Sequence, residues 1–157
     1  MTLPPATPAR NMEEFKKAAA RRMVAGGQGT RLGSDLPKGC FPLGPLSHKS
    51  LYQIQAEKVG ALSRAYGIAA PLLIMTSPAT DEVTRRFFAE HRDFGLRPGQ
   101  VRFFCQGQVP SLDLAGQALL AGPDALLLNP DGHGGCFTAL CTSGELDRLQ
   151  AEGHQHL

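Results

Sequence analysis

Residues 24–33 of this chain read VAGGQGTRLG, and Pro37 and Lys38 follow shortly after. Glycine lets the main chain approach a ligand where any side chain would collide, and backbone N–H groups can then surround a phosphate. Arg31 inside the loop and Lys38 beyond it add two positive charges. The stretch therefore predicts a nucleotide site that binds a polyphosphate.

Two common phosphate-binding motifs do not fit the spacing of this loop. A dinucleotide fingerprint requires G-x-G-x-x-G, and Leu32 stands where the third glycine belongs. A Walker A loop requires a Gly-Lys-Ser/Thr sequence, whereas Lys38 follows a proline. An ordinary glycine-rich turn is the remaining alternative, but Thr30 and Arg31 in register with the Pro-Lys pair favour the phosphate site.

Further segments follow the glycine loop in a fixed order and carry a resemblance to a known family. They are SLYQIQAE at 50–57, LLIMTS at 72–77, FFCQG at 103–107 and PDGHGG at 130–135. With these segments the chain resembles the uridylyltransferases that make UDP-sugars, and most of all the UDP-N-acetylglucosamine pyrophosphorylases, from about Met23 onward. The resemblance implies a Rossmann-like, GT-A-like nucleotidyltransferase fold of three layers with a mostly parallel sheet.

The resemblance also implies a reaction between UTP and a sugar 1-phosphate. An oxygen of the sugar phosphate would attack the α-phosphorus in line, pyrophosphate would leave, and a UDP-sugar, first of all UDP-N-acetylglucosamine, would form. Such a transfer needs positioning, and positive charge where negative charge develops. We expect Arg31 to face the leaving β- and γ-phosphates and Lys38 to face the α-phosphate, although each could also be a solvated surface charge.

The glycine loop would hold the nucleotide itself. By resemblance, Ala25, Gly26 and Gly27 would lie along the nucleotide, and Gly29 and Thr30 belong to the same loop.

A second group of residues is expected at the base and the sugar. By resemblance, Gln106 would hydrogen-bond the uracil edge and Gly132 would pack beneath the base or ribose. An amide both donates and accepts, as the uracil imide does, but Gln106 could equally be a strand-end side chain that bonds to the backbone. His133 stands where the acetylglucosamine enzymes more often carry asparagine and glucose-type enzymes carry histidine, so the identity of the sugar stays open.

Magnesium is expected for the complete enzyme, and its aspartate ligand would lie on a strand beyond Leu157. Asp131 stands beside a glycine and is interpreted as a turn former, so no metal ligand is assigned within the chain. The fold is expected to be truncated at its C-terminus.

Three hypotheses for the function follow. The first is the N-terminal part of a uridylyltransferase, acetylglucosamine-type or glucose-type. The second is an inactive nucleotide-binding fragment, and the third is another nucleotidyltransferase, such as a guanylyltransferase for a molybdenum cofactor.

Composition narrows the class of protein. The chain has 157 residues, of which 42% are hydrophobic, enough for one core. We expect a disordered or short helical extension at 1–22 and one catalytic-domain portion at 23–157, with the oligomeric state open. A net charge of +2 gives no basic field for a nucleic-acid partner. The four cysteines form no C-x-x-C pair and no apolar run approaches ~18 residues, so we expect a cytoplasmic protein without disulfides, zinc or a membrane span.

Hydrophobic periodicity and caps predict alternating helices and strands. The expected helices cover 11–22, 50–66, 77 to about 91, and 135–152. The helix at 50–66 has a Ser50–Gln53 capping box and an apolar stripe of Leu51, Ile54, Val59 and Leu62. The helix that begins at 77 turns Val83, Phe87 and Phe88 inward. The expected strands cover 72–75, 101–105 and 125–128, and a weak strand of only Met23 to Ala25 precedes the glycine loop. This alternation predicts a parallel sheet. Because the glycine loop, Gln106 and the Gly132 loop each follow an expected strand, we expect them to meet in one crevice.

Overall fold

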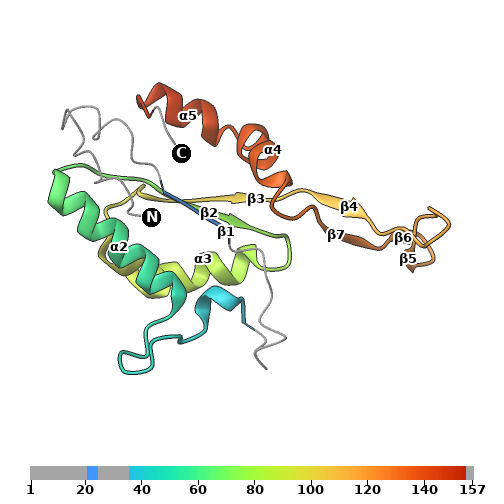
Figure 1. The fold of residues 1–157 in the computed structure, drawn as a ribbon, viewed down its shortest axis with the longest axis horizontal. Coiled ribbons are helices and arrows are strands. Elements are labelled where there is room, and N and C mark those ends of the chain that lie inside the picture. The colour runs from blue at the N-terminus through green and yellow to red at the C-terminus, as the bar shows by residue number, and fades with distance from the viewer. Residues whose placement is uncertain (1–20, 25–35, 155–157) are drawn as a thin grey trace, which may run out of the picture.

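A three-stranded parallel sheet forms the centre of the computed structural model, which describes residues 21–24 and 36–154 (Figure 1). Its strands are β1 (Arg21–Val24), β2 (Leu72–Thr76) and β3 (Val101–Cys105), in that spatial order. Val24 pairs with Met75, and Thr76 pairs with Cys105. The carboxyl ends of all three strands therefore lie at the same edge of the sheet.

One face of the sheet is covered by α2 (Leu51–Tyr66) and α3 (Asp81–Glu90). Leu72 and Ile74 of β2 enter a core there with Tyr52, Val59 and Phe88. Each helix lies in the crossover between two successive strands, and crossovers of one hand that advance in one direction cover the same face. A 3₁₀ turn, η3 (Arg92–Gly95), joins α3 to the approach of β3.

The opposite face is covered by α4 (Gly135–Thr142) and α5 (Glu145–Ala151), which gives the three layers seen in Figure 1. Leu73 and Met75 point to this side because successive side chains of a strand alternate between faces. They pack with Phe104, Leu140 and Leu149. The expected α/β architecture with a parallel sheet and helices on both faces is confirmed.

An ion pair fastens the last helix to the sheet. Nη2 of Arg102 on β3 donates to both carboxylate oxygens of Glu152, at 2.8 and 2.6 Å. Burial raises the pKa of Glu152, but the hydrogen bond and charge of Arg102, with smaller contributions from Arg148 and His154, outweigh it and leave the pKa below its usual value. The charged form of Glu152 is therefore the form that the folded chain favours.

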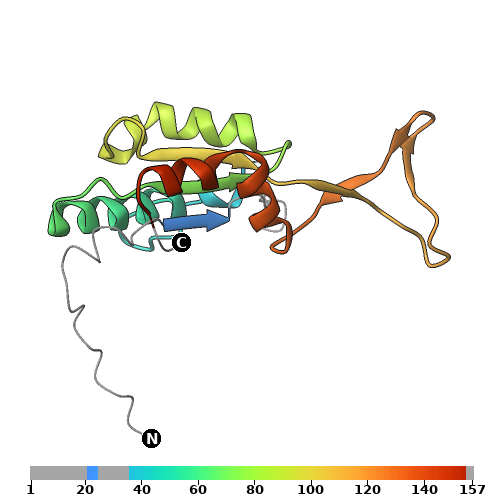
Figure 2. The same cartoon turned by 90° about the horizontal axis from the view of Figure 1, so that it is seen from above.

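Residues 108–130 form a long antiparallel extension, here called the arm, which projects from the layers (Figures 1 and 2). Its strands are β4 (Gln108–Pro110) paired with β7 (Leu128–Pro130), and β5 (Leu120–Gly122) paired with β6 (Ala125–Leu126). The strand expected at 125–128 is therefore wrong as a member of the parallel sheet. The chain reverses at Pro123-Asp124 and pairs with the preceding segment, so this apolar run stays exposed.

Helix α2 has the boundaries that its local signals predict. The side chain of Ser50 accepts from the backbone N–H of Gln53 at 3.1 Å, and Gly67 ends the helix at φ +65°. The Gln53 amide nitrogen donates to Glu57 at 3.0 Å, and among the described residues no hydrogen bond joins the Ser50 N–H to the Gln53 side-chain oxygen, so only the first half of the capping box is found. The fully buried face is made by Tyr52, Ala56, Val59 and Ser63, whereas Leu51, Ile54 and Leu62 of the expected stripe are only partly buried.

Three other expected helix boundaries differ from the structure. Arg21 and Arg22 belong to β1 and not to a helix; the rest of the helix expected at 11–22 lies outside the described residues. Helix α3 begins at Asp81 and not at residue 77, because Ser77 and Thr80 close a turn with two hydrogen bonds of 3.1 and 2.9 Å. The helix expected at 135–152 is broken at Gly144, where φ is +75°.

No helix within 21–24 and 36–154 combines the length and hydropathy that a membrane crossing requires.

Candidate nucleotide-binding site

The carboxyl edge of the sheet is the point from which three site segments leave. β1 ends at Val24, and Ala25, the first predicted site residue, follows directly. β2 ends at Thr76, and β3 leads into Gln106. The other predicted residues of the glycine loop lie, with Ala25, outside the described residues: Gly26, Gly27, Gly29, Thr30 and Arg31.

Gln106 sits directly on this edge. Its backbone N–H donates to the Thr76 carbonyl at 2.9 Å, which continues the pairing of β2 and β3 by one residue. The residue is only 6% exposed. Its backbone position is therefore fixed, while contact of its amide with a uracil stays a prediction.

The arm brings the Gly132 loop next to Gln106. Gln108 pairs with Pro130, and the N–H of Asp131 donates to the Gly107 carbonyl at 3.2 Å. Two residues after Gln106 are thus bonded to the residues just before Gly132. The expected meeting of these two segments is found, but the cause differs: an antiparallel ribbon and not another parallel strand joins them.

The Gly132–His133 segment turns from the arm into α4. Gly132 has φ +71°, a conformation that favours glycine, and both residues are exposed. The carbonyl of His133 accepts from the N–H of Cys136 at 3.3 Å, which ties the loop to the first turn of α4. The loop therefore presents the His133 side chain to solvent from a backbone that is held on both sides.

Asp131 occupies a space that two glycines leave open. A Cβ at Gly107 would lie 2.7 Å from Oδ2 of Asp131, and a Cβ at Gly135 would overlap the whole carboxylate. Oδ1 is buried and has no hydrogen-bond partner among the described residues. Gly107 and Gly135, from two different segments, thus leave room for the Asp131 carboxylate, a role that their positions in the sequence did not predict. Across residues 21–24 and 36–154, no cluster of His, Cys, Asp and Glu could hold a metal ion.

Lys38 lies on a separate element, the 3₁₀ turn η2 (Lys38–Cys40). The N–H of Cys40 donates to the Pro37 carbonyl at 2.9 Å, and that of Phe41 donates to the Lys38 carbonyl at 3.2 Å. Cys40 is buried, and burial raises the pKa of its thiol to about 11. The backbone of Lys38 is thus fixed and its side chain is exposed, but among the described residues no hydrogen bond or ion pair joins it to Gln106 or His133.

Sequence reasoning missed a polar network at the carboxyl end of β2. The Thr76 hydroxyl donates to Oδ1 of Asp81 at 2.5 Å, and Nε of Arg85 donates to Oδ2 at 2.7 Å. Burial raises the pKa of Asp81, but these two hydrogen bonds outweigh it and leave the pKa lowered. The network joins the end of β2 to the first turn of α3. The polar pair Thr76-Ser77 directly after an apolar strand was the available signal.

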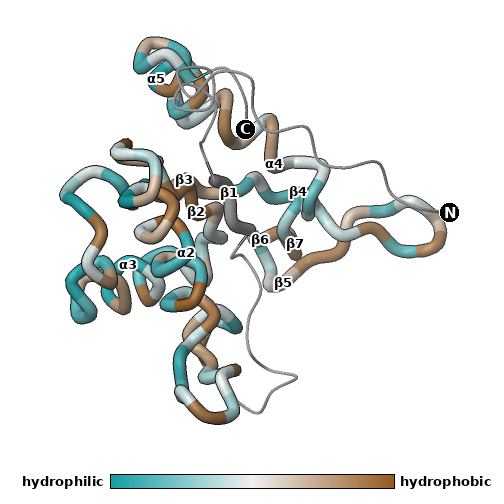
Figure 3. Tube along the Cα trace, turned by 60° about the vertical axis from the view of Figure 1, so that its left-hand side comes forward, coloured by the Kyte–Doolittle hydropathy of each residue, from teal (hydrophilic) through white to brown (hydrophobic). Residues whose placement is uncertain are grey.

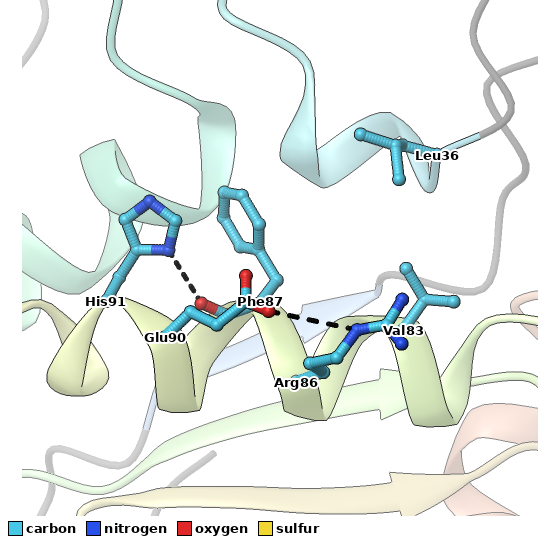
Figure 4. A pocket seen from close by; sticks show the side chains of 6 residues that line it. All are labelled: Leu36, Val83, Arg86, Phe87, Glu90 and His91. Atoms are coloured by element: carbon cyan, nitrogen blue, oxygen red, sulfur yellow. Dashed lines mark hydrogen bonds and ion pairs between the residues drawn. The ribbon is translucent and has the colours of Figure 1, made fainter.

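A pocket of about 430 Å³ lies on the outer side of α3, the side that faces away from the sheet (Figure 4). It is lined by Leu36 and by Val83, Arg86, Phe87, Glu90 and His91 of the helix. Nδ1 of His91 bonds to the Phe87 carbonyl at 2.8 Å, and Arg86 lies 3.9 Å from Glu90, so these side chains pair within the helix. Of the predicted site residues that the structure describes, Lys38, Gln106, Gly132 and His133, none lines this pocket.

A parallel sheet with helices on both faces defines the α/β class of proteins, which bind their ligands outside the carboxyl ends of the strands. The chain belongs to the UTP–glucose-1-phosphate uridylyltransferase family, whose model matches residues 5–157. The match begins before Met23, so it includes β1 in full. The resemblance found in the sequence is thereby confirmed.

Individual relatives agree with this family. UDP-N-acetylglucosamine diphosphorylase 1 of Arabidopsis thaliana is 43% identical over 145 residues, and UDP-N-acetylglucosamine pyrophosphorylase of Saccharomyces cerevisiae is 42% identical over 139 residues. Each match covers 86% of this chain, and the chain spans 29% of the length of either relative.

Solved structures give the same result. The UDP-N-acetylglucosamine pyrophosphorylase of Trypanosoma brucei, in complex with inhibitor, is 37% identical with a TM-score of 0.71, over 81% of this chain and 26% of that chain. A UDP-glucose pyrophosphorylase of Leishmania major, an L281D mutant, shares the fold at 22% identity with a TM-score of 0.77, over 96% of this chain and 31% of that chain.

Proposed function

We propose that the chain supplies the nucleotide-binding part of a uridylyltransferase that forms a UDP-sugar and pyrophosphate from UTP and a sugar 1-phosphate. One observation carries this proposal. The end of β1, Gln106 and the Gly132 loop leave the fold at one edge, where a family member would place its nucleotide. Within the proposal, the fold is a Rossmann-like, GT-A-like nucleotidyltransferase domain.

The residues at this edge divide the work between phosphate and base. Arg31 and Lys38 place positive charge against the triphosphate, where charge develops as pyrophosphate leaves. Gln106 offers a donor and an acceptor to the uracil, and its backbone is fixed by the hydrogen bond from its N–H to the Thr76 carbonyl. In-line attack on the α-phosphorus needs this positioning more than covalent help from the protein.

The proposed product is UDP-N-acetylglucosamine, since the relatives with 42% and 43% identity carry that sugar in their names. A glucose-type product is the alternative, and the exposed His133 is the residue that keeps it open. The two sugar phosphates differ at the acetamido group, so the ratio of turnover with each decides between them.

Magnesium remains part of the proposal for the complete enzyme. The described residues do not form a site for it, because they contain no cluster of metal-ligating side chains. Asp131 offers one unpaired carboxylate oxygen, which is too few ligands for a protein-held ion. We expect the aspartate ligand of the magnesium beyond Leu157.

We further propose a reducing, cytoplasmic location, in which the four free cysteine thiols would stay unpaired.

Isothermal titration of the purified chain with UTP, ATP and GTP, in the presence of magnesium, tests the proposal. We expect UTP to bind at least about tenfold more tightly than GTP, which corresponds to about 1.4 kcal/mol. Arg31→Ala and Lys38→Ala should each weaken binding of all three nucleotides by about tenfold or more, because each removes a charge-assisted contact. Gln106→Ala should lower the preference for UTP.

Lys58→Ala is the matched control, because Lys58 is an exposed lysine of α2 outside the proposed site. It should leave all three affinities unchanged. A chain that is folded by circular dichroism yet binds none of the nucleotides would refute the proposal. Tighter binding of GTP than of UTP would favour a guanylyltransferase instead, and UTP binding without turnover after the remaining polypeptide is supplied would favour an inactive binding fragment.

A further inference from the structure

The arm carries most of the exposed apolar surface of the described chain. Eight of the twelve large hydrophobic side chains that are exposed within 36–154 belong to it, including Leu120 at 62% and Leu114 at 109%. Figure 3 shows hydrophobic segments recurring along this extension. Together these side chains expose roughly several hundred Å², an amount that on a soluble protein marks an interaction site.

The backbone of the arm is held by its own hydrogen bonds. The N–H of Ser111 donates to the Leu127 carbonyl, that of Leu119 to Ser111, and that of Leu127 to Leu119, each at 2.8 Å. Oδ1 of Asp113 accepts from the N–H groups of Ala115 and Gln117, at 2.9 and 2.8 Å, and fixes the turn that carries Leu114. The arm thus presents apolar side chains from a defined backbone.

Cross-strand pairing also groups the side chains. Leu120 lies opposite Leu126, and residues directly opposite one another point to the same face of an antiparallel pair. Both are exposed, Leu126 at 46%. An isolated two-stranded ribbon is marginally stable in water. Burial of these apolar side chains against another surface would therefore stabilise the arm.

The composition of the arm points to an apolar protein surface as the cover. Residues 108–130 contain only two charged side chains, Asp113 and Asp124, and no lysine or arginine. An anionic membrane surface or a nucleic acid would require positive charge there.

The family comparison identifies which protein surface is available. The family match runs through the whole arm, so the arm belongs to the family's shared fold. The curated relatives are more than three times as long as the matched part, since the chain spans 29% of their length. Among the described strands, β1 and β3 each also keep one edge without a strand partner.

We propose that the apolar side chains of the arm pack against the polypeptide that the longer relatives carry outside the matched segment. The arm is then an internal docking surface of the complete fold. This proposal rests on family membership and not on the nucleotide site, so a failed nucleotide titration would leave it intact.

Hydrogen exchange in two proteins tests the proposal. One is this chain alone, and the other is a chimera in which this chain replaces its matched segment in the Arabidopsis thaliana relative. Amides of 108–130 should exchange at least about tenfold more slowly in the chimera, because packing covers the ribbon. Amides of the exposed turn at 43–49 are the internal control and should not change. Equal exchange of the arm in both proteins would overturn the proposal.

A pair of matched substitutions adds a second readout. Leu120→Thr removes an apolar side chain from the arm but keeps a residue that favours strands, and Leu46→Thr does the same at an exposed leucine outside it. In the chimera, Leu120→Thr should lower the Tm by several degrees more than Leu46→Thr, whereas in the chain alone the two should be equal. Equal shifts in the chimera would contradict the proposed packing.

Sedimentation of the chain alone covers the competing occupant, a second copy. We expect a monomer at micromolar concentration, whose arm amides exchange fast. A dimer that Leu120→Thr dissociates and Leu46→Thr does not would overturn the proposal in favour of self-association. This measurement needs no chimera, so the proposal stays testable if the chimera fails to fold.

Discussion

Gly39→Ala is the substitution whose effect the structure determines most sharply. Gly39 lies against the ring of Tyr52, and a Cβ at this position would come within 2.5 Å or less of three ring atoms. Carbon atoms normally approach to about 3.5–4 Å, so the ring or η2 would have to move by roughly 1 Å. Neither can move freely, because Tyr52 is fully buried and its ring lies 5.2 Å from that of Phe88.

The net effect is a balance of two opposing terms. Gly39 is not among the glycines with positive φ, so its backbone accepts alanine, which alone would stabilise the chain by about 0.4–1 kcal/mol. Overpacking a buried ring costs about 1–3 kcal/mol. We therefore expect Gly39→Ala to lower the free energy of unfolding by about 1–2 kcal/mol.

Urea unfolding at 25 °C, followed by far-ultraviolet circular dichroism because the chain lacks tryptophan, measures this change. Gly60→Ala is the matched control: in α2 its Cβ would meet only Arg64 Nη1 at 3.4 Å and Leu96 Cδ2 at 3.5 Å, so it should stabilise by about 1 kcal/mol. In a Tyr52→Leu background, the cost of Gly39→Ala should fall. A Gly39→Ala chain as stable as the parent would refute the reasoning.

Three further substitutions have defined outcomes. Ser50→Ala removes the N-cap of α2 and should cost about 1 kcal/mol in the same urea assay; no change would mean that the cap bond contributes nothing. Gly144→Ala places a side chain at φ +75° and should cost about 1–2 kcal/mol, and an unchanged midpoint would contradict strain there. The pKa of Glu152 is lowered on folding, so its contribution is present above the unfolded value of 4.5 and is lost as the pH falls through the folded pKa. Glu152→Gln should therefore reduce the loss of stability on acidification, and a steeper loss would have the wrong sign.

Local signals were sufficient where one element carries its own boundaries. Ser50 and Gly67 end α2 at both sides through contacts within a few residues. The run 72–75 is apolar throughout because β2 is buried on both faces, which makes such a strand recognisable. In these elements, propensity, capping and burial all favour the same structure.

Local signals failed where the partner decides the structure. Arg21 and Arg22 enter β1 because they pair with Leu72 and Leu73, which are distant in the sequence. Residues 125–128 are as apolar as a buried strand, yet their pairing partners lie in the arm and not in the central sheet. Hydropathy alone cannot distinguish a strand covered by helices from one left exposed for another part of the fold.

The described residues of the candidate site belong to two separate parts of the fold. Gln106 and Gly132 are held together by the bond between Asp131 and Gly107, so they form one unit at the base of the arm. Lys38 belongs to a different unit, because η2 is fixed by Gly39 packing on Tyr52 of α2. If the proposed roles hold, displacement of η2 should weaken the binding of UTP, ATP and GTP alike, since all three present the same triphosphate. A change at Gln106 should instead alter the ratio of the three affinities, so Gly39→Ala and Gln106→Ala separate phosphate binding from recognition of the base.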